Sequence, residues 1–347
     1  MKNGESYLSK TMNILAVLPH YGVTASRFLT DAFERIGFNV FRVGPKYDFH
    51  LDMQWEDSEM PKIDLELPKN ANWYIDDYVD AATRAGCTPD LVFLNEESYD
   101  NLIVNTEKVP SVLWSCDGWP QNYARREMIK PTLAYSNHVG IRIHPLDKLP
   151  EGWKYLAGGC APWVHKYLGL ERDDDFCLFS TMYGKRPEIC KSLIEEGYRA
   201  RFGQAKIPEY VRWYNKAWAT LHNPQPGEIK WRFFEAASMG CLNISWNCQL
   251  FERLRYNPWK HYVPIDVPEV GDDPWPSSSQ IMEVLDAIRD NHRYFKNIAD
   301  AARLHTVVFN SYYNRCQTIL ADLGMEKEAE QCQPFIDGAW KEHLGEL

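Results

Sequence analysis

The sequence predicts an α/β protein built from two Rossmann-like domains that face a cleft. In both halves of the chain, short apolar runs alternate with stretches of helical period, as in parallel sheets covered by helices. A length of 347 residues suits two domains. Because the pattern after residue 280 is helical throughout, we expect that segment to cross back and brace the first domain. The expected division is residues 1–165 for the first domain, 166–310 for the second and 311–347 for the C-terminal helices.

Elements of the first half follow one another at regular intervals. The expected strands are residues 13–19, 39–44, 90–95 and 111–115, and the expected helix is residues 26–36. Gly37 ends this helix, and Gly22 lies in the turn before it, so the segment predicts a strand–helix–strand unit. The acidic, proline-containing stretch 47–72 has no period and is predicted to be a long loop facing the cleft.

The second half restarts the same alternation after a junction at residues 156–175. The expected strands are residues 176–179, 198–202, 219–222 and 242–246, and the expected helices are residues 187–196, 210–217 and 230–239. Pro187 stands in the first turn of one helix and Gly197 follows its end, which is the usual arrangement of these two residues. The charge run 171–175 is predicted to be a solvated linker rather than a metal site.

Composition limits the function and the compartment. With 45% hydrophobic and 25% charged residues the chain is globular, and a net charge of −10 excludes a uniformly basic nucleic-acid coat, though not a local basic groove. The 13 Trp and 19 Tyr either fill cores or form stacking surfaces for planar rings and sugars. The nine cysteines include no CxxC pair, so we expect buried, reduced thiols in a cytoplasmic protein. The apolar run 13–19 is too short for a signal peptide or a membrane span.

Two segments of the second half carry candidate chemistry. Arg232 and Glu235 stand three residues apart at the start of a helix, where a cation suits a phosphate and a carboxylate suits a ribose diol. The alternative is an intrahelical ion pair on a surface helix. Gly184, Lys185 and Arg186 lie between a strand and a helix, where free backbone N–H groups face an anion. Taken together, the two segments predict a diphosphate site.

The order of these motifs resembles the donor domain of glycosyltransferases with the GT-B fold. The pieces that carry the resemblance are Ser180–Arg186, Phe202–Gly203 and Arg232–Gly240. CgeB-like spore-maturation transferases and phage β-glucosyltransferases that act on hydroxymethylcytosine in DNA are the most similar subfamilies. The resemblance covers nearly the whole chain in layout, but its specific motifs lie in the second half.

This resemblance implies a role for each matching residue. Arg186 and Arg232, with Lys185, would bind the nucleotide diphosphate, and Glu235 would bind the ribose. Gly22, Gly184 and Gly203 would line the donor site, and the base would lie near residues 202–207. The co-substrate would be a nucleotide sugar, most simply a UDP-sugar, with no permanently bound cofactor and no metal required at the site.

The first half supplies the candidate catalytic groups. In the phage enzymes a similar strand ends in an aspartate that acts as the base, which makes Asp117 the corresponding residue here. The alternative is that Asp117 only caps the turn before a glycine. His20, in the first loop, is the other candidate base or a donor-phosphate contact, and it too has a purely structural alternative.

Other residues bear on the acceptor and on the stereochemistry of the transfer. Trp119, Arg125 and Arg126 begin a stretch of basic and aromatic residues that extends to Lys148 and would meet DNA carrying a modified base. The alternatives are a solvated surface, or a rim that binds a glycan or a small molecule. Many retaining GT-B enzymes have a second glutamate at the position held here by Gly227, with Glu228 one residue away, which favours an inverting mechanism.

These observations predict a hexosyltransferase that uses a hydroxyl acceptor. We expect a monomer or weak dimer in the cytoplasm, which for a phage-encoded chain is the host's. Two other functions fit the same layout: a nucleotide-sugar epimerase of this fold, and a non-catalytic nucleotide-binding module. Incubation with the donor alone separates them, because only an epimerase converts the donor without an acceptor.

Overall fold

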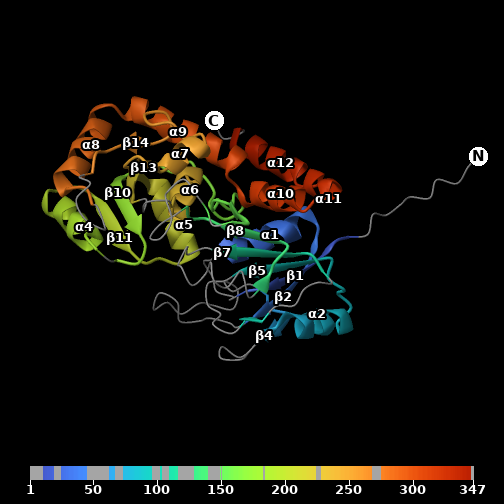
Figure 1. The fold of residues 1–347 in the computed structure, drawn as a ribbon. Coiled ribbons are helices and arrows are strands. Elements are labelled where there is room, and N and C mark those ends of the chain that lie inside the picture. The colour runs from blue at the N-terminus through green and yellow to red at the C-terminus, as the bar shows by residue number, and fades with distance from the viewer. Residues whose placement is uncertain are drawn as a thin grey trace, which may run out of the picture.

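The computed structural model describes most of the chain as two α/β halves, each built on one parallel sheet (Figure 1). The described residues are 11–18, 25–44, 62–66, 73–95, 102–103, 109–115, 129–139, 149, 151–182, 184–223, 228–267 and 275–344.

The first sheet has seven strands in the order β3-β2-β1-β5-β7-β8-β9, and all of its pairs are parallel. Its strands are β1 (Asn13–Val17), β2 (Asn39–Gly44), β3 (Leu65–Glu66), β5 (Leu91–Asn95), β7 (Ser111–Ser115), β8 (Leu133–Ser136) and β9 (Trp153–Tyr155). A separate two-stranded pair consists of β4 (Trp73–Tyr74) and β6 (Leu102–Ile103). Strands β1, β2, β5 and β7 confirm the predicted ones.

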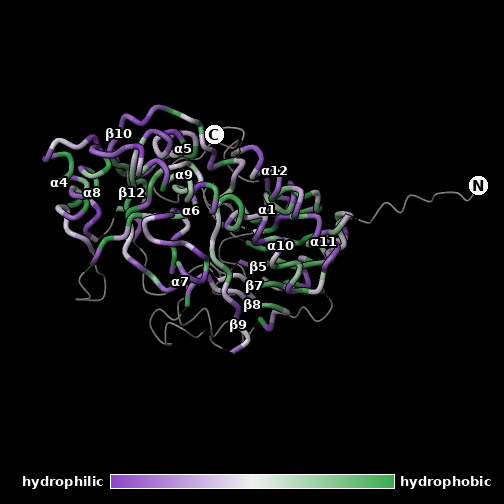
Figure 2. The backbone as a smooth tube through the Cα atoms, turned by 90° about the horizontal axis from the view of Figure 1, so that it is seen from above, coloured by the Kyte–Doolittle hydropathy of each residue, from purple (hydrophilic) through white to green (hydrophobic). Residues whose placement is uncertain are grey.

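Helices cover both faces of this sheet, because its strands are apolar on both sides. On β1, Ile14 and Ala16 belong to the core beneath α1 (Ala25–Ile36), whereas Leu15 and Val17 belong to the core beneath α2 (Ile75–Arg84). The central strands accordingly include hydrophobic stretches in Figure 2.

The second sheet has five strands in the order β11-β10-β12-β13-β14, again all parallel. Its strands are β10 (Asp174–Phe179), β11 (Ala200–Gly203), β12 (Ala217–His222), β13 (Leu242–Ser245) and β14 (Val263–Pro264). The helices of this half are α4 (Arg186–Glu195), α5 (Ile207–Lys216), α6 (Trp231–Ser238), α7 (Gln249–Arg253), α8 (Ser278–Asp290) and α9 (His292–Phe309).

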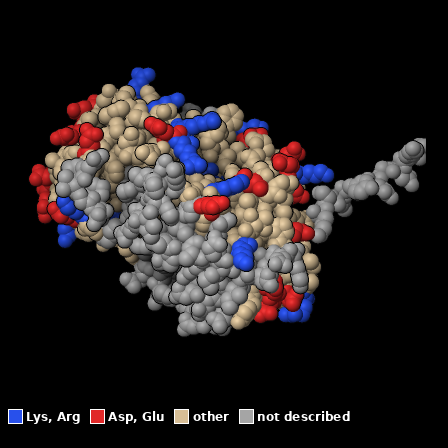
Figure 3. Space-filling model, in the orientation of Figure 1, with Lys and Arg blue, Asp and Glu red and all other residues tan. Residues whose placement is uncertain are grey.

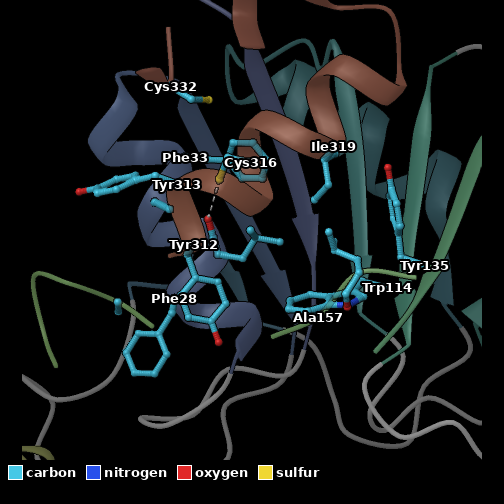
Figure 4. Packing of buried hydrophobic residues seen from close by; sticks show 14 of the residues in the cluster. Phe28, Phe33, Trp114, Tyr135, Ala157, Tyr312, Tyr313, Cys316, Ile319 and Cys332 are labelled. Atoms are coloured by element: carbon cyan, nitrogen blue, oxygen red, sulfur yellow. Dashed lines mark hydrogen bonds between the residues drawn. The ribbon is translucent and has the colours of Figure 1, made fainter. Parts of the chain in front are cut away.

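The C-terminal helices return to the first half, as predicted. They are α10 (Tyr312–Asp322), α11 (Glu326–Glu330) and α12 (Gln333–Leu344). In Figure 4, Cys316 and Ile319 of α10 point toward α1 and the sheet, and the Cys316 thiol donates to the carbonyl of Leu29 at 3.8 Å. Tyr135 of β8 donates to Asp322 at 2.6 Å. The last helices therefore complete the core of the first half.

A second chain crossing joins the two halves beside this core. Cys160 forms a parallel bridge with Ser311, with backbone hydrogen bonds of 2.9 Å to Asn310 and Tyr312. Arg315 is buried and donates from Nε to the carbonyls of Ala157 and Gly158, both at 2.9 Å. The segments before β10 and after α9 thus run side by side.

The structure corrects two predictions at the junctions. Asp174 and Asp175 are not part of a solvated linker: they begin β10, are buried, and pair with Arg201 and Arg289. The stretch predicted as one long loop contains β3, which extends the sheet edge beside β2. Both elements escaped the pattern because charged or very short strands have no apolar run.

Two global expectations can also be compared with the described residues. No described helix has the length and hydropathy needed to cross a membrane. The described cysteines are unpaired thiols, all buried except the half-buried Cys248, and Cys116 lies outside the described residues.

Candidate functional site

The strand order of the second sheet reverses at β10, which neighbours β11 on one side and β12 on the other. Open parallel sheets bind ligands outside the carboxyl ends of the strands at such a switch point, because the loops there diverge to opposite faces. In this half, β10 ends at Phe179 and β12 at His222.

Arg186 lies across this switch point. Its Nη1 donates to the carbonyl of Thr181, just after β10, at 2.9 Å, and its Nη2 donates to Oδ1 of Asn223, just after β12, at 2.6 Å. The side chain is buried, and its guanidinium carbon lies 5.6 Å from the centre of the Trp275 ring. Arg186 therefore joins the two strand ends and fixes a positive charge between them.

The turn before Arg186 has a backbone that favours glycine. Gly184 has φ +58°, and a Cβ at this residue would lie 2.9 Å from the Trp275 ring. Lys185 follows as the exposed N-cap residue of α4. The turn thus presents a cation and the first N–H groups of α4 at the same strand end, which suits an anion.

Arg232 reaches the same place from α6. Its Nε donates to the carbonyl of Phe179, the last residue of β10, at 2.8 Å. Since Arg186 bonds the carbonyl two residues further along, the two guanidinium groups converge on the end of β10. Gly203, which ends β11 with φ +130°, accepts a hydrogen bond from the N–H of Ser180 at 2.7 Å and so joins β11 to this group.

Glu235 lies one turn further along α6 between Tyr210 and His165. The Tyr210 hydroxyl donates to Oε2 at 2.6 Å, and burial together with Glu235 raises the pKa of Tyr210, so the phenol keeps its proton. His165 accepts the Ala161 N–H at Nδ1 and lies with Nε2 3.7 Å from Oε1. Burial lowers the pKa of His165, which leaves the ring neutral. At 3.7 Å, Oε1 of Glu235 lies too far from Nε2 of His165 for a hydrogen bond.

A neutral histidine supports the start of α6. The Lys230 N–H donates to Nε2 of His222 at 3.1 Å, and Nδ1 of His222 is 3.1 Å from the Ser245 hydroxyl. Burial and the neighbouring Arg232 hold the pKa of His222 well below its ordinary value. Because Nε2 accepts, the proton lies on Nδ1 and points to Ser245.

One contact between the two halves was not predicted. His138, just after β8, lies with Nε2 3.2 Å from Oε1 of Glu228, and the two residues form an antiparallel backbone bridge between the halves. Lys230 also pairs with Glu228. Burial opposes ionisation of Glu228, but His138 and Lys230 hold its pKa at about 2. Sequence analysis identified Glu228 by its spacing, whereas a lone histidine after a strand gave no signal for His138.

The remaining predicted site residues lie outside the described residues. They are His20, Gly22, Asp117, Trp119, Arg125 and Arg126. Their roles stay predictions. Asp117 follows β7 by two residues, and β7 lies next to β8, whose end leads to His138. Among the described residues, no group of three or more His, Cys, Asp or Glu side chains is arranged to hold a metal ion.

Charge on the surface is mixed where the structure describes it. In Figure 3, Lys and Arg side chains are interspersed with Asp and Glu over the described part of the face in view, without a continuous basic stripe.

Asn137, which directly follows β8, is buried, and both polar atoms of its side chain lack a hydrogen-bond partner in the described part of the chain. An amide of this kind can bind a polar ligand.

Comparison with known proteins identifies the fold. The sequence matches no protein-family model and no curated protein. An α-glucosyltransferase solved with UDP-glucose and DNA superposes with a TM-score of 0.59 and 10% identity, over 90% of this chain and 99% of that one. HepE from Anabaena, solved with UDP and glucose, gives 0.57 and 14%, over 90% and 100%. Sucrose-phosphate synthase from Thermosynechococcus elongatus gives 0.52 and 11%, over 90% and 98%. The chain has the GT-B glycosyltransferase fold, as its motifs predicted.

Proposed function

We propose that the protein is a glycosyltransferase that moves a hexose from a UDP-sugar to a hydroxyl acceptor. One observation carries the proposal: in a GT-B fold, Arg186 and Arg232 converge on the switch point of the second sheet, and Glu235 lies one turn away. Two of the similar structures were solved with UDP or UDP-glucose, which supports UDP as the nucleotide.

The proposed orientation of the donor follows from the positions of these residues. The diphosphate lies at the end of β10, against Lys185, Arg232 and the start of α4, with Arg186 contributing its fixed charge. The ribose reaches Glu235, where Oε2 is already bonded to Tyr210 and Oε1 is available to accept from a ribose hydroxyl. The base then lies near residues 202–207, at the end of β11 and just beyond it.

Sugar transfer follows from the charges at this site. The acceptor hydroxyl attacks the anomeric carbon while Asp117 takes its proton, and the bond from that carbon to the diphosphate breaks. UDP leaves with the bonding electrons, and the arginines stabilise the negative charge that develops on it. A single displacement inverts the anomeric centre. Glu228 is bonded to His138 and Lys230, and so joins the two halves instead of attacking the sugar.

For the acceptor we propose two candidate classes. One similar structure contains DNA, and residues 119–148 hold basic and aromatic side chains, so DNA with a hydroxymethylated base is the first candidate. A glycan or a small hydroxyl compound is the second. Transfer from radiolabelled UDP-glucose to hydroxymethylated DNA, unmodified DNA and a glycan panel identifies the class.

The donor site is tested with Glu235→Gln. This change removes the carboxylate charge and should weaken UDP binding by about tenfold or more, the usual effect of losing a charge-assisted hydrogen bond. Titration calorimetry with UDP measures the affinity, and Glu209→Gln, an exposed glutamate on α5, is the matched control. Unchanged UDP affinity in Glu235→Gln would exclude the ribose contact.

Catalysis is tested separately from donor binding. Asp117→Asn should abolish most of the transfer while leaving UDP affinity within about twofold, because the base acts only on the acceptor. Incubation with the donor alone is the decisive control: conversion of the UDP-sugar without an acceptor indicates an epimerase. UDP binding with neither transfer nor hydrolysis indicates a non-catalytic module.

A further inference from the structure

A pocket lies in the C-terminal half, at the opposite end of the sheet's strands from the donor site. Its volume is about 470 Å³. Asp175 is the second residue of β10, Arg199 directly precedes β11, and Trp218 is the second residue of β12, so the pocket opens at the amino ends of these strands. The donor site lies at their carboxyl ends.

The lining has more positive than negative side chains. Its cations are Arg172, Arg199, Arg289 and Lys296, and its carboxylates are Glu171 and Asp175. Two of these cations have a carboxylate partner of their own. Arg289 binds both oxygens of the buried Asp175, at 3.1 and 2.8 Å, and Lys296 pairs with Asp300 at 2.5 Å. Arg172 and Arg199 form no ion pair among the described residues, and the remaining lining carboxylate, Glu171, is exposed.

Arg172, which lines this pocket, has an unused hydrogen-bond donor. Its Nη2 donates to the carbonyl of Gly240 at 2.5 Å, but its Nη1 is buried and has no hydrogen-bond partner in the described part of the chain. A buried donor without an acceptor destabilises a protein by about 1–3 kcal/mol. Because Arg172 lines the pocket, a rotation of its guanidinium would bring Nη1 to an anion there, which would accept from it and remove that penalty.

Arg199 supplies the second cation at the rim. Its side chain is exposed, and its charge interacts with Asp173 and Asp175, although it forms an ion pair with neither of these two described residues. The backbone N–H of Arg199 is bonded to Asp175, which holds this residue beside the pocket. Its guanidinium can therefore turn toward a ligand while the backbone stays fixed.

Two aromatic rings form a flat wall beside these cations. Trp218 and His292 stack with centroids 4.3 Å apart and planes 13° from parallel, and the guanidinium of Arg172 lies 4.7 Å from the Trp218 ring. Trp218 is half-buried and His292 is exposed. Stacked rings next to arginines favour a ligand with both a planar ring and a negative charge.

We propose that this pocket binds a nucleoside monophosphate. The phosphate accepts from Arg172 and Arg199, and the base lies against the Trp218–His292 stack. The volume falls within the range of small-molecule sites, about 300–1,000 Å³. This ligand is separate from the sugar donor, because the two sites lie at opposite ends of the strands of the same sheet.

Calorimetric titration with AMP, in the presence of excess UDP to fill the donor site, tests the proposal. Wild-type protein should bind AMP, and adenosine should bind at least about tenfold more weakly because it lacks the phosphate. Arg199→Glu should weaken AMP binding by about tenfold or more, whereas Lys191→Glu, an exposed charge reversal on α4 outside the pocket, should leave it unchanged. Since Arg199 is exposed, its variant should fold normally.

Three results would overturn the proposal: no AMP binding by the wild-type protein, equal binding by the two charge variants, or equal affinity for ribose 5-phosphate and AMP. The third result would show that the ring wall does not recognise a base. None of these readouts uses transfer activity. A failure of the proposed glycosyltransferase function would therefore appear in the UDP titration and leave the comparison of Arg199→Glu with Lys191→Glu intact.

Discussion

At the carboxylate of Glu228, burial and charge act in opposite directions. Burial favours the neutral acid, but His138 and Lys230 favour the anion and hold its pKa at about 2. Because His138 belongs to the first half and Lys230 to the second, this one carboxylate is bonded to both sides of the cleft. The charge of Glu228 thus stabilises the contact between the halves.

This pairing predicts a specific pH dependence of stability. The folded pKa of about 2 lies below the ordinary glutamate value of 4.5, so ionised Glu228 stabilises the fold above about pH 5. That stabilisation, roughly 3 kcal/mol from the size of the shift, is lost as the pH falls from about 4.5 to about 2. Urea unfolding of wild type and Glu228→Gln should therefore differ most near pH 6 and converge near pH 2.

A matched substitution makes this measurement specific. Glu209→Gln changes an exposed glutamate and should show only a small difference at any pH. A gap between wild type and Glu228→Gln that stays constant from pH 6 to pH 2 would mean that the carboxylate charge does not stabilise the folded state.

The site residues also show which features of the site can be predicted from the sequence and which cannot. The motif residues Arg186, Arg232 and Glu235 could be predicted because their types and spacing are unusual for plain surface helices. Their hydrogen-bond partners could not, since Asn223 and Tyr210 come from other elements and meet them only in the folded chain. Asp174 and Asp175 were misassigned for the same reason: their arginine partners lie 27 and 114 residues away.

Among the elements, the turn from β10 into α4 determines how the cations are presented. The turn passes through Gly184, whose positive φ and close approach to Trp275 leave no room for a side chain. The next two residues are Lys185 and Arg186, so any displacement of the turn moves both charges. Most elements could be predicted from their apolar period, whereas β3, β4 and β6 have two residues each, too few for a period to be visible.

Gly184→Ala tests the role of this turn. A left-handed backbone costs an alanine about 1–2 kcal/mol, and the added methyl group also meets the Trp275 ring. We expect lower stability in urea and weaker UDP binding, because Lys185 and Arg186 are displaced together.

Gly197→Ala is the control within the same half. Gly197 follows α4 with φ +84°, and a Cβ there would meet nothing within 4 Å. It should lose stability through the backbone alone and keep its UDP affinity. Equal losses of UDP affinity in the two variants would argue against a specific role for the turn at Gly184.

At the scale of the whole molecule, the C-terminal helices return to the first half and complete its hydrophobic core. One hydrophobic core contains residues of α1, strands of the first sheet and α10 (Figure 4). The same core also includes Phe233 and Phe234 of α6. The two-sheet layout and the returning helices followed from the sequence pattern. The shared core did not, because an amphipathic helix shows that it has a partner but not which one.

Ile319→Ala tests this shared core. Ile319 is fully buried on α10, and truncating such a side chain typically costs about 2–5 kcal/mol. Thr318→Ala, at the adjacent exposed position, should change stability by less than about 0.5 kcal/mol. Urea unfolding followed by circular dichroism measures both, and a comparable loss in the two variants would show that α10 does not stabilise the core.

The contact of α10 with α1 also has a consequence during synthesis on the ribosome. The strands of the first sheet emerge early, but the helix that covers α1 begins only at residue 312. Until then, Phe33 and the carbonyl of Leu29 lack their final neighbours. The second half can fold as soon as it emerges, so we expect the half made first to be completed last, with chaperones binding its open face in the interval.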